Sequence, residues 1–197
     1  MTAWHAAQLA LACLAVVQLA RVALAIAWRA PADSRALAEA FSVAIRGRQR
    51  ELAQAIAAAT QPGWAAQMLA GVFDEPSEAR PEDTMEEIRG VLVGEQADRL
   101  RALAAFGRIA SPFAFLAIVL ELGAAFGPGH GLAALQRGLV QSIAIERALL
   151  SFAIGLATAL LCTAGASLMR ERLRALSDEL KRARDVAARA FRADPDM

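Results

Sequence analysis

The most constraining feature of this sequence is how its apolar residues are grouped. One long apolar segment opens the chain at residues 3–28, and two more lie close together near its end, at 107–127 and 139–169. A helix of about 20 consecutive apolar residues is long enough to cross a bilayer. The first two segments are separated by a polar, charged stretch. This layout predicts an all-α membrane protein with three transmembrane helices.

A cleaved signal peptide is the alternative for the first segment, because alanine-rich signal segments look similar. It fits less well for three reasons: no basic stretch precedes the apolar run, the run is long, and the positive charges of Arg29 and Arg35 follow it. Arg21 is the only formal charge inside the run. We therefore expect a membrane-spanning helix here.

The direction of the chain through the membrane is predicted from its basic residues. A turn rich in Gly and Pro at 127–131 joins the last two apolar segments, so residues 128–138 are expected to form a hairpin loop. Basic residues gather after the first segment and in the tail (Arg29, Arg35, Arg46, Arg48, Arg50, Arg170, Arg172, Arg174, Lys181, Arg182, Arg184). By the positive-inside rule, the N-terminus and the hairpin loop lie outside, while residues 29–106 and 170–197 lie in the cytoplasm.

The composition agrees with a membrane protein and gives little support to other classes of protein. The chain is 57% hydrophobic, with a mean hydropathy of +0.38, which is high for a soluble protein. A soluble bundle of alanine-rich helices remains the alternative. The net charge is only +1, and the basic residues lie where the predicted membrane topology places them. The charge therefore gives no reason to expect binding to nucleic acid.

We expect no enzyme, cofactor, metal or catalytic residue. Cys13 and Cys162 fall in apolar segments and suit packing, and His5 and His130 are far apart with no supporting carboxylates or cysteines. No glycine-rich phosphate loop or nucleophile elbow is present.

The region after the first segment is predicted to be helical, with two breaks. Apolar residues at helical spacing predict one helix from 33 to about 60 (Leu37, Phe41, Ile45, Leu52, Ile56). Residues 61–63 break it, and a short helix follows over 64–73. An acidic surface loop is expected at 74–83, and a helix from Thr84 continues into the second apolar segment. Residues 170–192 continue the third segment as a charged amphipathic helix.

Three stretches of the chain, taken in order, resemble a known family. They are residues 44–56 with 62–72, residues 101–112 ending in Pro112, and residues 148–160 with Gly155-Leu156. Together they resemble the ExbB/TolQ/MotA proton-channel family, most closely its ExbB/TolQ branch. The resemblance implies a homopentamer in the bacterial inner membrane, whose second and third spans surround the helices of ExbD/TolR-like single-span partners. A carboxylate on the partner would carry the proton.

The sequence departs from the family in the pore helices. The resemblance puts one expected threonine on Val119 and the other on Phe152, with Ser151 beside it. The family's glutamate falls on Arg147, or on Glu146 if the register slips by one residue. Ser151 and Thr158 are candidates for facing the pore, although helix packing explains hydroxyl residues equally well.

Charges inside apolar segments supply the remaining candidates. A charge at the centre of a span costs about 2.5–3.5 kcal/mol on insertion scales, so it usually has a partner. Glu121 and Arg147 lie at comparable depth from the hairpin, and we expect them to pair, within one subunit or across a boundary. In one version, the pair only stabilises the hairpin. In the other, Glu121 or Glu146 takes the place of the two missing threonines in a path for protons.

The sequence thus predicts an inner-membrane subunit of a proton-driven ExbB/TolQ-like motor serving envelope transport, integrity or motility. A non-conducting structural or accessory paralogue is the second hypothesis. An unrelated three-span protein is the third.

Overall fold

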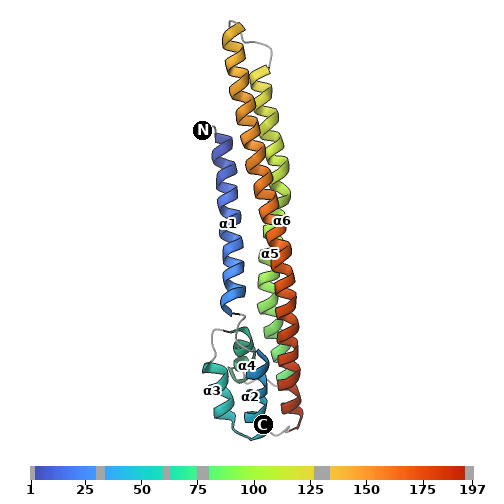
Figure 1. Ribbon diagram of the computed structural model, residues 1–197. Helices are drawn as coiled ribbons and strands as arrows, with labels where there is room; N and C mark the ends of the chain where they lie inside the picture. Colours follow the sequence, from blue (N-terminus) through green and yellow to red (C-terminus); the bar gives the residue numbers. More distant parts are fainter. Residues whose placement is uncertain (1–2, 30–33, 60–62, 75–79, 127–133, 194–197) are drawn as a thin grey trace. The chain divides into compact units, whose positions relative to one another are not determined.

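The computed structural model describes residues 3–29, 34–59, 63–74, 80–126 and 134–193. These residues form six helices and no strands: α1 (Ala3–Arg29), α2 (Ser34–Arg46), α3 (Arg50–Ala59), α4 (Trp64–Asp74), α5 (Pro81–Phe126) and α6 (Ala134–Ala193) (Figure 1). Among them, α1, α5 and α6 are long and apolar enough to cross a membrane. The all-α class with three such helices is therefore confirmed. The predicted turn at 127–131 lies outside the described residues.

The two longest helices each join a charged part to an apolar part without a break. The charged part of α5 leads into the apolar part through Pro112, and α6 runs from its apolar part into a charged C-terminal part. Pro81, followed by Glu82 and Asp83, suits the first turn of α5, where a missing amide proton costs nothing and acidic groups face the helix dipole. The continuous helices predicted from the sequence are thus confirmed.

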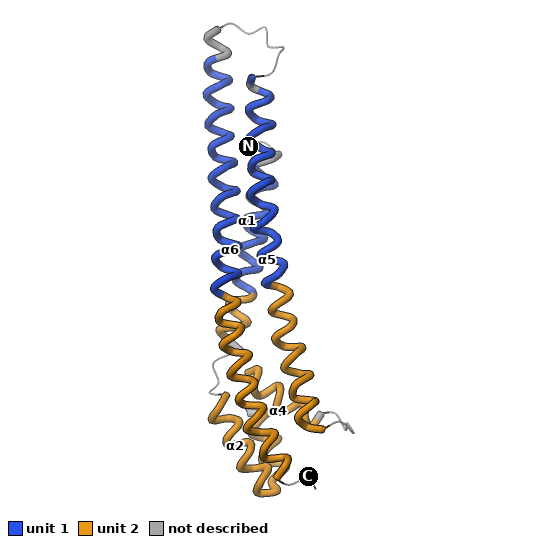
Figure 2. Tube along the Cα trace, turned by 90° about the vertical axis from the view of Figure 1, so that its right-hand side faces the viewer, with its two compact units in different colours: residues 1–21, 100–168 blue, residues 22–99, 169–197 orange. Residues whose placement is uncertain are grey.

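The chain divides into two compact units (Figure 2). Unit 1 comprises residues 1–21 and 100–168, and unit 2 comprises residues 22–99 and 169–197. Since α1, α5 and α6 each contribute to both units, the boundary cuts across helices and does not fall in a loop.

Unit 1 is packed through small residues. A Cβ added at Gly155 of α6 would lie 2.1 Å from the Ala114 Cβ of α5, and one at Gly107 would lie 2.9 Å from the Cys162 Cβ. These two contacts run in opposite directions along the chain, so α5 and α6 are antiparallel. Around them lies a core of Ala15, Leu103, Cys162 and Ala166. In a membrane the hydrophobic effect does not drive helices together, and small side chains allow the close packing that holds them.

Unit 2 has a larger core built around Phe41 of α2. The Phe41 ring is fully buried, and its centroid lies 5.8 Å from that of Phe73 in α4 and 6.1 Å from that of Phe191 in α6. Ring pairs at these distances add to the stabilisation from buried area. The three aromatic side chains therefore tie α2 and α4 to the charged part of α6.

The prediction of one helix over residues 33–60 is wrong, because the helix ends at Arg46 and α3 begins at Arg50. Arg48 has a φ of 58°, its amide donates to the Ile45 carbonyl at 2.9 Å, and the Gln49 amide donates to the Ala44 carbonyl at 2.9 Å. This is the hydrogen-bond pattern of a Schellman motif, which usually has glycine where this chain has arginine. The turn also changes the helical phase, so Leu52, predicted on the apolar face, is 48% exposed.

Ion pairs join the charged parts of α5 and α6 within unit 2. Glu86 accepts hydrogen bonds from Arg89 and Arg184, Arg89 Nη1 donates to Ser177 Oγ at 2.8 Å, and Arg192 Nε donates to Glu82 at 3.0 Å. The hydrogen bond from Arg89 lowers the pKa of Glu86, with help from the charges of Arg89 and Arg184 and against the opposing effect of partial burial. These contacts fix the register of the two helices on their charged parts.

Candidate functional site in the apolar helices

The best candidate site is a line of buried polar side chains where α1 meets α6 in unit 1. The buried positions of α1 lie three, seven, seven and four residues apart, which is the spacing of a helix packed along one side. The apolar ones are Ala15, Val22 and Ile26, but the first two along the helix are His5 and Gln8, each only 3% exposed. Facing them, α6 contributes Ser151 and Thr158, which are 0% and 4% exposed and seven residues apart. We call His5, Gln8, Ser151 and Thr158 the polar seam.

His5 connects the two helices directly. Its Nε2 atom lies 3.3 Å from Ser151 Oγ and 3.4 Å from the backbone oxygen of Arg147. A carbonyl oxygen can only accept, so the second hydrogen bond requires a proton on Nε2. The imidazole thus ties the start of α1 to one turn of α6.

Gln8 differs from its neighbours because its side chain is buried without a hydrogen-bond partner. Neither its amide nitrogen nor its oxygen has a partner in the described part of the chain. An unpaired buried amide costs about 1–3 kcal/mol. The helices α1 and α6 run parallel, since His5 lies beside Ser151 and Leu19 lies beside Gly165 further along both helices. This alignment places Gln8 at a height between Ser151 and Thr158. The Thr158 hydroxyl donates to its own helix, at the Ile154 carbonyl, at 2.7 Å.

Within the described residues, the polar seam joins α1 to α6 by hydrogen bonds through His5, whereas Gln8 has no partner and Thr158 bonds within α6. Imidazole, amide and hydroxyl groups both donate and accept hydrogen bonds, so the same groups are also able to bind water. The described residues include no group of three or more histidine, cysteine or acidic side chains arranged to hold a metal ion.

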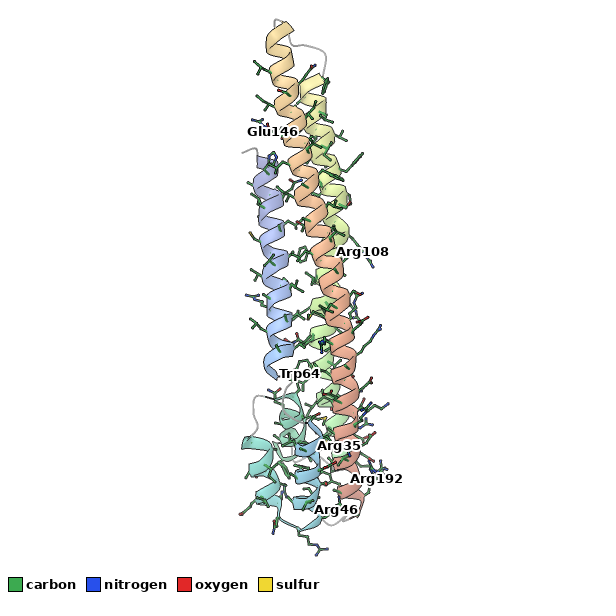
Figure 3. The ribbon with its side chains drawn as sticks, in the orientation of Figure 1. Arg35, Arg46, Trp64, Arg108, Glu146 and Arg192 are labelled. Atoms are coloured by element: carbon green, nitrogen blue, oxygen red, sulfur yellow. The ribbon has the colours of Figure 1, made fainter. Side chains whose placement is uncertain are left out.

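The other predicted site residues lie elsewhere on α5 and α6. The side chains of Val119 and Phe152 are 49% and 50% exposed. Glu121 is partly exposed, whereas Glu146 and Arg147 are exposed; Figure 3 labels Glu146 on α6. Within one chain, no ion pair between Glu121 and Arg147 is found in the part that the structure describes. Their pairing between chains stays a prediction.

Sequence reasoning found half of the polar seam. Ser151 and Thr158 were candidates, but as possible pore residues, and the structure buries them against other helices. From the sequence, His5 is weighed only as a metal ligand, and nothing singles out Gln8. The available signal is their spacing, because both residues continue the helical spacing of Ala15, Val22 and Ile26 toward the N-terminus.

No family model matches this chain, and no match is found among curated proteins or solved structures. Its class is therefore defined by the fold: an all-helical protein with three helices long and apolar enough to cross a membrane.

Proposed function

We propose that this chain is an inner-membrane subunit of a proton-motive-force-driven motor resembling ExbB and TolQ. Five copies would surround the helices of an ExbD/TolR-like partner. The observation that carries the proposal is the order of the elements. A single apolar helix, α1, precedes a small bundle of α2, α3 and α4, and two long helices follow, each joining an apolar part to a charged part. The three stretches of family resemblance occur along this same order.

The proposal includes an N-terminus outside the cytoplasm and a cytoplasmic unit 2. Its support is the placement of basic residues in the charged parts of the chain. The ion pairs of Glu82 and Glu86 with α6 belong to those charged parts, where water and salt surround them. In this orientation α5 and α6 extend well into the cytoplasm.

A non-conducting accessory subunit is the second candidate, and side-chain burial favours it. The two positions that resemble the family's pore threonines carry the apolar side chains of Val119 and Phe152, each about half exposed. The Ser151 and Thr158 hydroxyls are buried inside one chain instead. An outward-facing path along α5 and α6 would therefore lack both expected hydroxyls.

Stoichiometry and proton flux distinguish the candidates. The chain is co-expressed with a single-span protein encoded beside it, and the complex is purified in detergent and weighed by native mass spectrometry. Five copies with two partner helices, together with proton uptake by liposomes containing the complex, support the motor. A pentamer that passes no protons supports the accessory subunit, and a monomer refutes both.

A further inference from the structure

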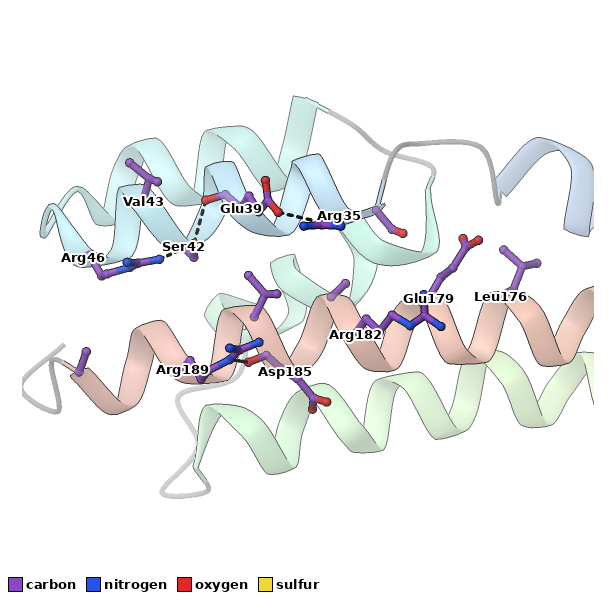
Figure 4. Close-up of a pocket in the computed structure, with 14 residues that line it drawn as sticks. Arg35, Glu39, Ser42, Val43, Arg46, Leu176, Glu179, Arg182, Asp185 and Arg189 are labelled. Atoms are coloured by element: carbon purple, nitrogen blue, oxygen red, sulfur yellow. Dashed lines mark hydrogen bonds and ion pairs between the residues drawn. The ribbon is translucent and has the colours of Figure 1, made fainter.

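A groove of about 1350 Å³ opens between α2 and the charged part of α6 in unit 2 (Figure 4). Leu176, Ala183 and Val186 of α6 give it apolar surface. Its arginines form two groups, with Arg35 and Arg182 toward one end and Arg46 and Arg189 toward the other. The groove therefore combines an apolar strip with arginines at both ends, and the carboxylates of Glu39, Glu179 and Asp185 also line it.

Most of this positive charge has no carboxylate partner. Arg35 pairs with Glu39 at 2.8 Å, and Asp185, which also lines the groove, pairs with Arg184 outside it at 2.7 Å. Arg46 donates to the Ser42 hydroxyl at 3.2 Å and Arg189 to the Asp185 backbone oxygen at 3.1 Å. In the described ranges no carboxylate pairs with Arg46, Arg182 or Arg189. As far as the described residues go, these three guanidinium groups can therefore pair with carboxylates of another chain.

The outward side of α5 in the same unit has the opposite charge pattern. One helix face carries three acidic residues with small and apolar residues between them (Asp83, Glu87, Gly90, Val91, Gly94, Glu95), and we call it the α5 face. Glu95 pairs with Arg99 of the same helix, so Asp83 and Glu87 provide the negative charge that a partner could meet. Val91 at its centre is 66% exposed, and a Cβ added at Gly90 or Gly94 would meet nothing within 4 Å. Glycines without neighbours leave room for another chain to approach the backbone closely.

The two surfaces are also similar in length. At 1.5 Å per residue, Asp83 and Glu95 lie about 18 Å apart along α5, and Arg35 and Arg46 lie about 16 Å apart along α2. The two surfaces are therefore of similar length, but the acidic groups of the α5 face that lack a partner in the described residues, Asp83 and Glu87, lie at one end, because Glu95 pairs with Arg99 of its own helix. Glu179 also lines the groove, at the end where Arg182 lies.

We propose that the α5 face of one copy docks in the groove of the next copy. Glu87 and Asp83 would meet the unpaired arginines, and Val91 would be buried on the apolar strip. Because the two surfaces are different patches of unit 2, the contact is head-to-tail, and such contacts close into rings when the rotation allows. The contact rests on the self-association that the proposed function requires, but it does not depend on proton conduction.

Site-specific photo-cross-linking of the full chain in membranes tests this contact. A benzophenone amino acid replaces Val91, and a matched variant carries it at Leu52 of α3, which is 48% exposed and lies outside both surfaces. Illumination is expected to give dimers and higher ladders only from position 91, and peptide mapping is expected to place the new bond on the apolar residues of the groove (Val43, Leu176, Ala183, Val186). Ladders that map elsewhere overturn the contact.

Charge reversal provides an independent test. Glu87→Arg or Arg182→Glu should each lower the cross-linked fraction about tenfold, equivalent to about 1.4 kcal/mol, and the double variant should restore it. Arg174→Glu, at an exposed α6 position outside the groove, is the matched control and should change nothing. If Arg182→Glu leaves the cross-linked fraction unchanged, Arg182 does not bind the neighbouring α5 face and the docking proposal is wrong.

The two proposals fail in different ways. A native pentamer whose position 91 does not reach the groove overturns this contact and leaves the proposed function standing. A monomer in native mass spectrometry overturns both.

Discussion

Replacing Gly155 with alanine tests the close packing of α5 against α6. The added Cβ would lie 2.1 Å from the Ala114 Cβ and 3.3 Å from the Ala110 backbone oxygen. Since ordinary contacts begin near 3.4 Å, the helices must separate by about 1.3 Å at this point. Overpacking of this kind costs about 1–3 kcal/mol, whereas removing glycine from a helix interior returns about 0.5–1 kcal/mol.

Gly123→Ala is the matched control, because it gains the same helix preference while its Cβ would meet nothing within 4 Å. The difference between the two variants therefore isolates packing, and Gly155→Ala should be less stable than Gly123→Ala by about 1–3 kcal/mol. The free energy of unfolding is measured by titrating detergent-solubilised protein with SDS and following circular dichroism. Equal stabilities of the two variants would show that Gly155 is not needed for the close approach.

Three further predictions concern single side chains, each measured as a free energy of unfolding. Gln8→Leu removes an unpaired buried amide and should stabilise the protein by about 1–3 kcal/mol; a loss of stability would mean that the amide is paired. Glu86 has a lowered pKa in the folded state, so its stabilisation is present above the ordinary carboxyl pKa and is lost as pH falls through the lowered value. Because its side chain is 42% exposed, Glu86→Gln should cost only about 0.2–1 kcal/mol at pH 7, and the difference from the parent protein should vanish in acid; a constant difference would contradict this assignment. Arg48→Gly relieves a φ of 58° and should stabilise by about 1 kcal/mol, whereas Arg48→Ala should not.

The long helices of this protein follow from local sequence, whereas turns and contacts between segments depend on the tertiary structure. The sequence predicts that α5 and α6 each join a charged part to an apolar part without a break, because the helical pattern of residues is not interrupted there. The break between α2 and α3 was missed because Arg48, and not glycine, occupies the left-handed position, so the usual terminating signal is weak. The end of α2 is therefore visible in the hydrogen bonds around Gly47 and Arg48, whereas the residue types there do not indicate it.

The candidate site shows the same division. Ser151 and Thr158 are recognisable as polar residues in an apolar helix, but their partners cannot be read from spacing alone. His5, which reaches Ser151, lies at the other end of the sequence. The pairing of Glu121 with Arg147 stays a prediction between chains.

The sequence by itself determined that three helices would be long and apolar enough to cross a membrane, because length and composition are properties of each segment alone. Only the tertiary structure decided which side of each helix faces its neighbours. A helix that is apolar nearly all round can be rotated about its axis without changing its pattern, so packing selects the rotation. Here the close contacts of Gly155 with Ala114 and of Gly165 with Leu19 do so. They bury Ser151 and Thr158 and leave Val119 and Phe152 on the outside.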